Sequence, residues 1–195
     1  MPDPPDAVRA FIAVPLPDPI LVFLGKLQSE IKLSGIKAAW PNPDTFHLTL
    51  KFLGVVSHDR LPSIQAVMER FSGYCPNLFL TVGRIGVFPG VRNPRVVWAD
   101  IGGQTRRLTH LFRDLDRALC ALAFPVQPRR FSPHITLGRI KSRVSPGVMS
   151  PLLNRFKNMR PEKFKATGLV LYQSRLTSEG AIHTRLFEVN LDVHR

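Results

Sequence analysis

The sequence predicts an α+β protein with two similar lobes, in which duplicated β-α-β units form antiparallel-rich sheets that face each other across a central cleft. Three observations support this prediction, of which the first is a His-x-Thr-Leu tetrad that begins both at His47 and at His134. Before each tetrad come a short apolar segment and then a longer segment with apolar residues at helical spacing. The separation from Phe11 to His47 is one position shorter than that from Val97 to His134. We therefore expect residues 1–195 to form a single bilobal domain of two pseudo-symmetric halves, each contributing one tetrad strand.

The first half of the chain is expected to contain three strands and two helices. Residues 9–16 are short and apolar, as in a strand buried on both faces. Asp18 and Pro19 resemble the N-cap and the first residue of a helix that Gly35 ends. After a Pro-rich loop and the first tetrad strand, we expect a second helix and then a strand over 78–87. The apolar faces of the two helices carry Ile20, Leu24, Leu27 and Ile31, and Leu61, Ile64, Met68 and Phe71.

The second half repeats this order of elements. We expect a strand at 95–101, a helix at 104–122 and, after another Pro-rich loop, the second tetrad strand. A helix at 148–156 and a strand at 164–172 then mirror the elements that follow the first tetrad. Alternating apolar residues over 182–191 predict a last strand.

Each tetrad strand is expected to present an imidazole and a hydroxyl on the same face. Successive side chains of an extended strand point to opposite faces. The first copy therefore places His47, Thr49 and Lys51 together, and the second copy places His134 beside Thr136. The opposite, apolar face of the first strand carries Phe46, Leu48, Leu50 and Phe52.

This arrangement favours acid and base catalysis at a phosphorus centre. A histidine exchanges a proton near neutrality, and two of them on opposite sides of a phosphate can act as acid and base in one turnover. A threonine hydroxyl two residues along can donate to phosphate oxygens. A lone histidine in a strand is more often structural, but two copies at matching positions of a duplicated unit indicate a shared active site.

The composition points to an anionic partner. The formal net charge is +13, from 27 Lys and Arg against 14 Asp and Glu, which favours RNA, DNA, nucleotides or an anionic membrane. No single basic run dominates.

Cys75 and Cys120 are expected to be buried thiols. The start of the chain does not resemble a signal peptide and no apolar run could span a membrane, so we expect a cytoplasmic protein.

The segments HLTLKFLG and SPHITLGR resemble the two-histidine phosphoesterase superfamily, and within it the bacterial and archaeal RNA 2′,3′-cyclic phosphodiesterases, also called 2′-5′ RNA ligases. The opening Phe11-Ile12-Ala13, the Phe88-Pro89 turn and the closing segment 171–176 add to this resemblance. It implies a LigT-like fold and an enzyme without metal or other cofactor. Such an enzyme opens the 2′,3′-cyclic phosphate of RNA, oligonucleotides or cyclic nucleotides to a 2′-phosphomonoester, and in some members joins or cleaves 2′-5′ linkages. We also expect a monomer that does not bind membranes.

The same resemblance implies roles for the tetrad residues. His47 would donate a proton to the leaving 3′ oxygen, and His134 would be the base that activates water. Thr49 and Thr136 would hold the phosphate.

Four further residues are candidates for substrate binding, namely Arg139, Lys51, Phe52 and Tyr172. Arg139 matches an arginine that often follows the second tetrad in the family, although strict alternation places it opposite His134 unless the strand bulges. Phe52 and Trp40 could stack a base, but core packing is the expected role of Phe52. Outside the tetrads, we expect the histidines to lie at the surface or to pack, and these are His58, His110, His183 and His194.

Two other functions are compatible with the sequence. A non-catalytic module that binds RNA or nucleotides would suit the basic charge, but binding alone does not require two imidazoles. A metal-dependent phosphohydrolase could use His47 and His134 as ligands, but the sequence lacks Asp or Glu ligands clustered at short spacing.

Overall fold

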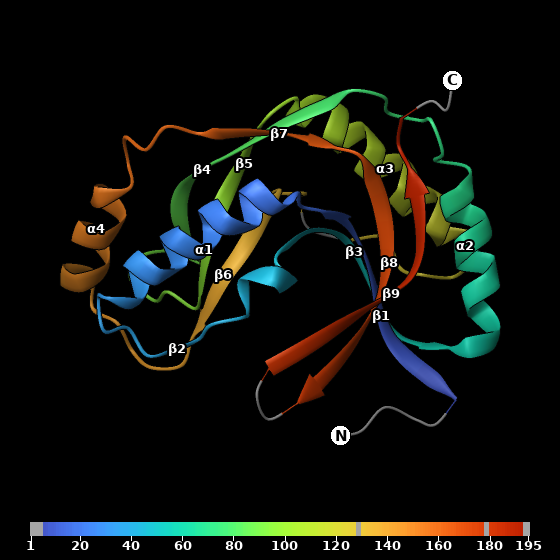
Figure 1. Cartoon of the computed structure of the whole chain (residues 1–195). Coiled ribbons are helices and arrows are strands. Elements are labelled where there is room, and N and C mark those ends of the chain that lie inside the picture. The colour runs from blue at the N-terminus through green and yellow to red at the C-terminus, as the bar shows by residue number, and fades with distance from the viewer. Residues whose placement is uncertain (1–5, 128–129, 178–179, 193–195) are drawn as a thin grey trace.

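The computed structural model describes residues 6–127, 130–177 and 180–192, which form two antiparallel sheets and the helices that cover them (Figure 1). The four-stranded sheet has the order β3-β1-β8-β9, with β1 at Ala7–Pro15, β3 at His47–Ser57, β8 at Gly168–Thr177 and β9 at Gly180–Asn190. The five-stranded sheet has the order β2-β6-β5-β4-β7, with β2 at Ala38–Ala39, β4 at Leu78–Phe88, β5 at Val96–Gly103, β6 at His134–Ile140 and β7 at Glu162–Ala166. The predicted α+β fold is confirmed.

The α-helices are α1 at Asp18–Lys32, α2 at Leu61–Glu69, α3 at Thr105–Cys120 and α4 at Pro146–Arg155, and short 3-10 turns occur at η1, Pro43–Thr45, and η2, His58–Arg60. The N-cap of α1 is Pro17 rather than the predicted Asp18, which lies in the first turn. No α-helix in the described part of the chain is long and apolar enough to cross a membrane.

The two sheets do not correspond to the two halves of the sequence. Strand β4 follows the first tetrad but pairs with β5 and β7, in the sheet that contains the second tetrad. Strands β8 and β9 come from the second half but join β1 in the sheet that contains the first tetrad. Each half of the chain therefore supplies strands to both sheets.

The prediction of a single strand over 164–172 was wrong, because this segment contributes to both sheets. The chain leaves the five-stranded sheet after Ala166 and enters the four-stranded sheet at Gly168. The backbone of β9 approaches closely there, since a Cβ built on Gly168 would lie 2.8 Å from the carbonyl oxygen of Val189. A glycine at this position lets β8 begin beside β9.

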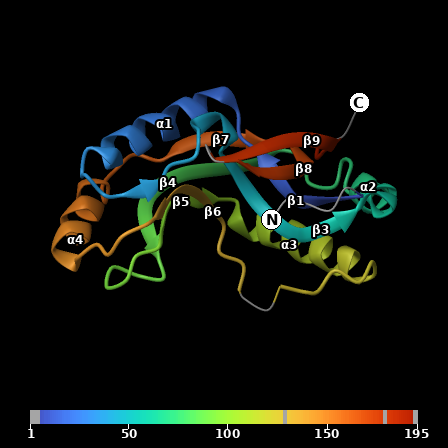
Figure 2. The same ribbon diagram turned by 90° about the horizontal axis from the view of Figure 1, so that it is seen from below.

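Helices α1 and α3 lie on opposite sides of the molecule (Figure 2). Helix α1 packs on β6, while α3 packs on β3 and β4 and has α2 beside it. The apolar faces predicted for α1 and α3 are confirmed, because all of their expected inward residues are at most 5% exposed: Ile20, Leu24, Leu27, Ile31, Leu108, Leu111, Leu115 and Leu119. Burying one such side chain stabilises a fold by about 1.5–3 kcal/mol. Cys75 is buried as expected, but Cys120 at the end of α3 is exposed.

Candidate active site

The two tetrad strands adjoin although they belong to different sheets. Strand β3 is the edge of the four-stranded sheet, and it closely approaches β6 of the five-stranded sheet. His47 is the first residue of β3 and His134 is the first residue of β6. The fold thus brings the two histidine strands together from distant parts of the sequence.

Both histidines make the same hydrogen bond. Nδ1 of His47 lies 2.7 Å from the carbonyl oxygen of Thr45, and Nδ1 of His134 lies 2.7 Å from the carbonyl oxygen of Ser132. Because a carbonyl oxygen only accepts, Nδ1 of each ring carries the hydrogen and donates it. In each neutral imidazole, Nε2 is then the nitrogen with the free lone pair.

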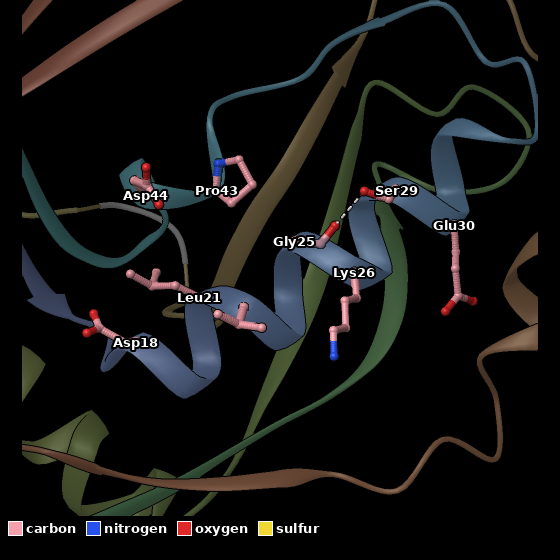
Figure 3. A pocket seen from close by; sticks show the side chains of 9 residues that line it. Asp18, Leu21, Gly25, Lys26, Ser29, Glu30, Pro43 and Asp44 are labelled. Carbon is pink, nitrogen blue, oxygen red and sulfur yellow. Dashed lines mark hydrogen bonds between the residues drawn. The ribbon is translucent and has the colours of Figure 1, made fainter.

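The carbonyl that holds His47 belongs to a fixed turn. The hydroxyl of Thr45 donates to the carbonyl oxygen of Asn42 over 2.7 Å and so closes η1. Helix α1 supports this turn through Gly25, where an added Cβ would lie 3.3 Å from Pro43 (Figure 3). The pocket in Figure 3 lies between α1 and η1, and neither tetrad histidine lines it.

The carbonyl that holds His134 is supported by the other long helix. Phe131, next to Ser132, stacks on Phe112 of α3 with ring centroids 4.1 Å apart and planes 5° from parallel. Helix α3 therefore supports the segment before β6, as α1 supports the segment before β3.

The surroundings of His47 are aromatic, and the residue is half-buried. Its ring centroid lies 4.6 Å from that of Phe11, 5.2 Å from that of His183 and 6.1 Å from that of Tyr172. Burial lowers the pKa of His47 to about 4, the hydrogen bond to Thr45 acts in the opposite direction, and the nearby His183 lowers the pKa further. His47 is therefore neutral at pH 7 in the free protein.

His134 lies in a different aromatic environment. Its ring meets that of Phe88 edge-on, with centroids 5.0 Å apart, and the ring of Trp98 lies 6.4 Å away. Trp98 fits here because Gly86 opposite it has no side chain, and a Cβ there would lie 2.3 Å from the indole.

Both tetrad strands bulge at the leucine of the tetrad. In β3, Thr49 pairs with Ala13 and Lys51 with Ile12, which leaves Leu50 without a partner in β1. In β6, the residues on either side of Leu137 pair with consecutive residues of β5. An extra residue in one strand reverses the alternation of the residues after it, and in β3 a second bulge at Leu53 restores it.

The bulge in β3 reverses two predictions made from strict alternation. Lys51 is 2% exposed, and its amino group binds the Asp116 carboxylate of α3 and the carbonyl oxygen of Pro125. Phe52 was expected in the core, but it is 62% exposed, and its ring centroid lies 6.0 Å from that of Phe11. Lys51 therefore has a structural role, and Phe52 lies on the face of His47.

The bulge in β6 resolves the conflict over Arg139. Ile140 is buried and Arg139 is exposed, so alternation after the bulge returns Arg139 to the face of His134 and Thr136. Thr49 and Thr136 precede the bulges and keep the faces predicted for them.

Three other aromatic or histidine positions differ in their outcome. Tyr172 stacks on Phe11 with centroids 5.2 Å apart, and burial raises its pKa. Trp40 covers Gly138, where a Cβ would lie 2.5 Å from the indole ring, so it packs against β6. His183, expected at the surface or in packing, is half-buried and packs against Phe11 and His47, a contact that no motif around it indicated. His58 and His110 are exposed as expected, and His194 lies outside the described residues.

Similarity to known proteins extends over most of the chain. The family described as LigT like Phosphoesterase matches residues 14–98 and 101–183. The chain is 30% identical over 176 residues to the RNA 2′,3′-cyclic phosphodiesterase of Methanocaldococcus jannaschii, which covers 90% of this chain and 96% of the relative. It is 31% identical over 173 residues to the protein of the same name from Aeropyrum pernix, which covers 85% of this chain and 93% of that relative.

Solved structures share the fold. TT0787 of Thermus thermophilus superposes with a TM-score of 0.77 at 25% identity, over 96% of this chain and 100% of that chain. LigT of E. coli in complex with 3′-AMP superposes with a TM-score of 0.74 at 25% identity, over 95% of this chain and 98% of that chain.

Proposed function

The chain belongs to the family of LigT-like phosphoesterases, and we propose that it is an RNA 2′,3′-cyclic phosphodiesterase that hydrolyses cyclic phosphate ends to 2′-phosphomonoesters. The resemblance inferred from the two tetrads is confirmed. The observation that carries the proposal is the matched pair of histidines, each of which donates from Nδ1 to a backbone carbonyl and so has Nε2 available for proton transfer. A module that only binds RNA has no need of this pair.

In the proposed reaction, water attacks phosphorus while Nε2 of His134 takes its proton. The bond from phosphorus to the 3′ oxygen breaks, the bond to the 2′ oxygen stays, and His47 gives a proton to the leaving 3′ oxygen. The hydroxyls of Thr49 and Thr136 and the guanidinium of Arg139 donate to the non-bridging oxygens, on which negative charge gathers.

For His47 to act as the acid, substrate binding must protonate it. In the free protein, burial holds its pKa near 4. An anionic phosphate beside the ring favours the charged imidazolium and raises this pKa, because opposite charges at close range stabilise each other. We therefore infer that His47 takes up its proton when the cyclic phosphate binds.

Phe52 and Tyr172 are proposed to contact the base or ribose of the substrate. Both rings lie near Phe11, beside the His47 ring, and Phe52 is largely exposed. Exposed aromatic faces next to a phosphate site stack bases without strong sequence preference. Lys51 is excluded from this role by its burial against Asp116.

The reaction is proposed to need no metal, and the protein is proposed to act as a monomer. Among the described residues, no group of three or more His, Cys, Asp or Glu side chains could hold a metal ion. Proton transfer and hydrogen bonding supply the chemistry instead.

The deciding experiment is an assay of a cyclic-ended oligonucleotide and of 2′,3′-cyclic AMP after exhaustive chelation, with the product identified by ³¹P NMR. We expect a 2′-phosphomonoester, and we expect loss of activity in His47→Gln and His134→Gln but not in His110→Gln, which alters an exposed histidine of α3. Binding of the oligonucleotide without hydrolysis would support the non-catalytic alternative, and activity that returns only with a divalent ion would support a metal enzyme.

A further inference from the structure

A third histidine touches the ring of His47 from the far edge of its sheet. His183 belongs to β9, which is separated from β3 by β1 and β8. The rings of His47 and His183 nevertheless lie 5.2 Å apart, with planes at 87°, so that one ring meets the other edge-on. His183 also meets Phe11 edge-on, with centroids 5.0 Å apart. The ring of His47 is thus packed against both Phe11 and His183.

A bulge in β9 accompanies this contact. Leu171 pairs with Phe187 and Tyr172 with Arg185, which leaves Leu186 without a partner in β8. Bulged strands bend and twist more strongly. The bulge at Leu186 lies between the open end of the β8–β9 hairpin and His183. The bend at the bulge therefore acts on the segment that carries His183 toward β3.

One ring nitrogen of His183 has no partner. Its Nδ1 is buried and forms no hydrogen bond with any described residue. At such a position, a nitrogen lone pair without a hydrogen-bond partner costs less free energy than an N–H group without one. Protonation of the His183 ring would put an unpaired N–H there. The surroundings therefore favour neutral His183, and burial lowers its pKa.

Charged and titratable groups on three strands interact with the two rings or with Tyr172 beside them. Strand β3 contributes His47, β8 contributes Tyr172, and β9 contributes Arg185 and Glu188, which bind each other over 2.8 Å near Tyr172. Strand β1 contributes the uncharged ring of Phe11. Among these groups, a proton on His183 would act on His47, because it disfavours a second positive charge on the neighbouring ring.

We propose that His183 is a positioning residue for His47, which it holds in one ring plane and keeps neutral until an anion binds. The edge-on contact restricts rotation of the His47 ring about the bond to its side-chain stem, while the Thr45 carbonyl fixes the position of Nδ1. Together they define the direction of Nε2. The catalytic part of this inference rests on the proposed function, but the effect on the protonation of His47 does not.

The test follows the titration of the His47 ring by NMR in the free protein, together with kcat and KM for a cyclic phosphate. The substitution His183→Ala removes the ring contact and the second imidazole and makes His47 less buried. The pKa of His47 should therefore rise toward 6.5. We expect kcat to fall about tenfold with a smaller change in KM, which is less than the ~10²-fold that a badly misplaced group can cost. His183→Phe keeps an aromatic edge against His47 and should restore most of kcat.

His110→Ala on the exposed side of α3 is the matched control and should change neither the titration nor kcat. An identical titration of His47 in wild type and in His183→Ala would overturn the inference, as would a kcat for His183→Phe as low as that of His183→Ala. If the pKa of His47 shifts as expected but the wild type hydrolyses no cyclic phosphate, the proposed function is rejected and the effect of His183 on His47 stands.

Discussion

Gln28 of α1 donates from Nε2 to the carbonyl oxygen of Leu137, 3.0 Å away, at the residue that forms the bulge of β6. The same Nε2 donates to the carbonyl oxygen of Pro41 over 2.9 Å, and the side chain is fully buried. A bulge interrupts the ladder and leaves backbone groups that need other partners. Helix α1 supplies one, and through this bulge it helps to set the face on which Arg139 lies.

Replacement Gln28→Leu should destabilise the protein by about 1–3 kcal/mol, because the buried carbonyl oxygen of Leu137 and the partly buried one of Pro41 lose a donor. Urea unfolding followed by circular dichroism measures this change. The control is Ser29→Ala, since the Ser29 hydroxyl bonds only within α1, to the carbonyl oxygen of Gly25, at an exposed position. Equal stability of the two variants would show that the bulge does not depend on Gln28.

Replacement Lys51→Met should destabilise the protein by about 3–5 kcal/mol, because it leaves the Asp116 carboxylate buried without its cation. Chemical denaturation again provides the measurement. On the same helix, Arg117→Met breaks an exposed pair with Asp114 and should cost about 1 kcal/mol or less.

The double variant Lys51→Met with Asp116→Leu tests the cause of that loss. Removing both charges should recover most of the stability, since apolar side chains of similar size often replace a buried ion pair without loss. If the double variant is no more stable than Lys51→Met, the loss comes from other contacts than the ion pair, namely the bond from Lys51 to Pro125 and the bond that the backbone N–H of Gln127 donates to Asp116.

The low pKa of His47 predicts a loss of stability in mild acid. The folded value of about 4 lies below the ordinary value of 6.5, so the unfolded chain binds more protons between these two pH values. The contribution of His47 is fully present above pH 6.5 and is lost as the pH falls toward 4, by up to about 3 kcal/mol. We expect His47→Gln to lose less stability than wild type between pH 7 and pH 4 in urea unfolding. Parallel curves would mean that the folded protein does not lower the pKa of His47.

The division of labour between the two tetrads predicts a selective rescue. Substitution of His47 or His134 by Ala should reduce kcat by about 10²-fold to 10⁴-fold, the usual worth of a positioned acid or base. A substrate with an intrinsically good leaving group needs little protonation, so it should restore His47→Ala far more than His134→Ala. Rescue of His134→Ala instead would exchange the two roles.

Local patterns in the sequence determined most of the elements and the candidate catalytic residues. The helical spacing of the leucines in α3 and the alternation of the tetrads involve residues close together in the sequence. These patterns therefore predict secondary structure without knowledge of the tertiary fold. The repeated tetrad likewise singled out His47 and His134 as candidate catalytic residues, and the backbone carbonyl that holds each ring lies only two residues before it.

Only the tertiary structure decided the register and the neighbours of these residues. Whether Leu50 and Leu137 bulge depends on pairing with β1 and β5, and one extra residue turns the side chains that follow it, up to the next bulge, to the other face. That is why Lys51 and Phe52 exchanged their predicted places. His183 meets His47 because β9 joins the sheet of β3 from the far end of the chain, and no local pattern encodes a contact between strands so distant in sequence.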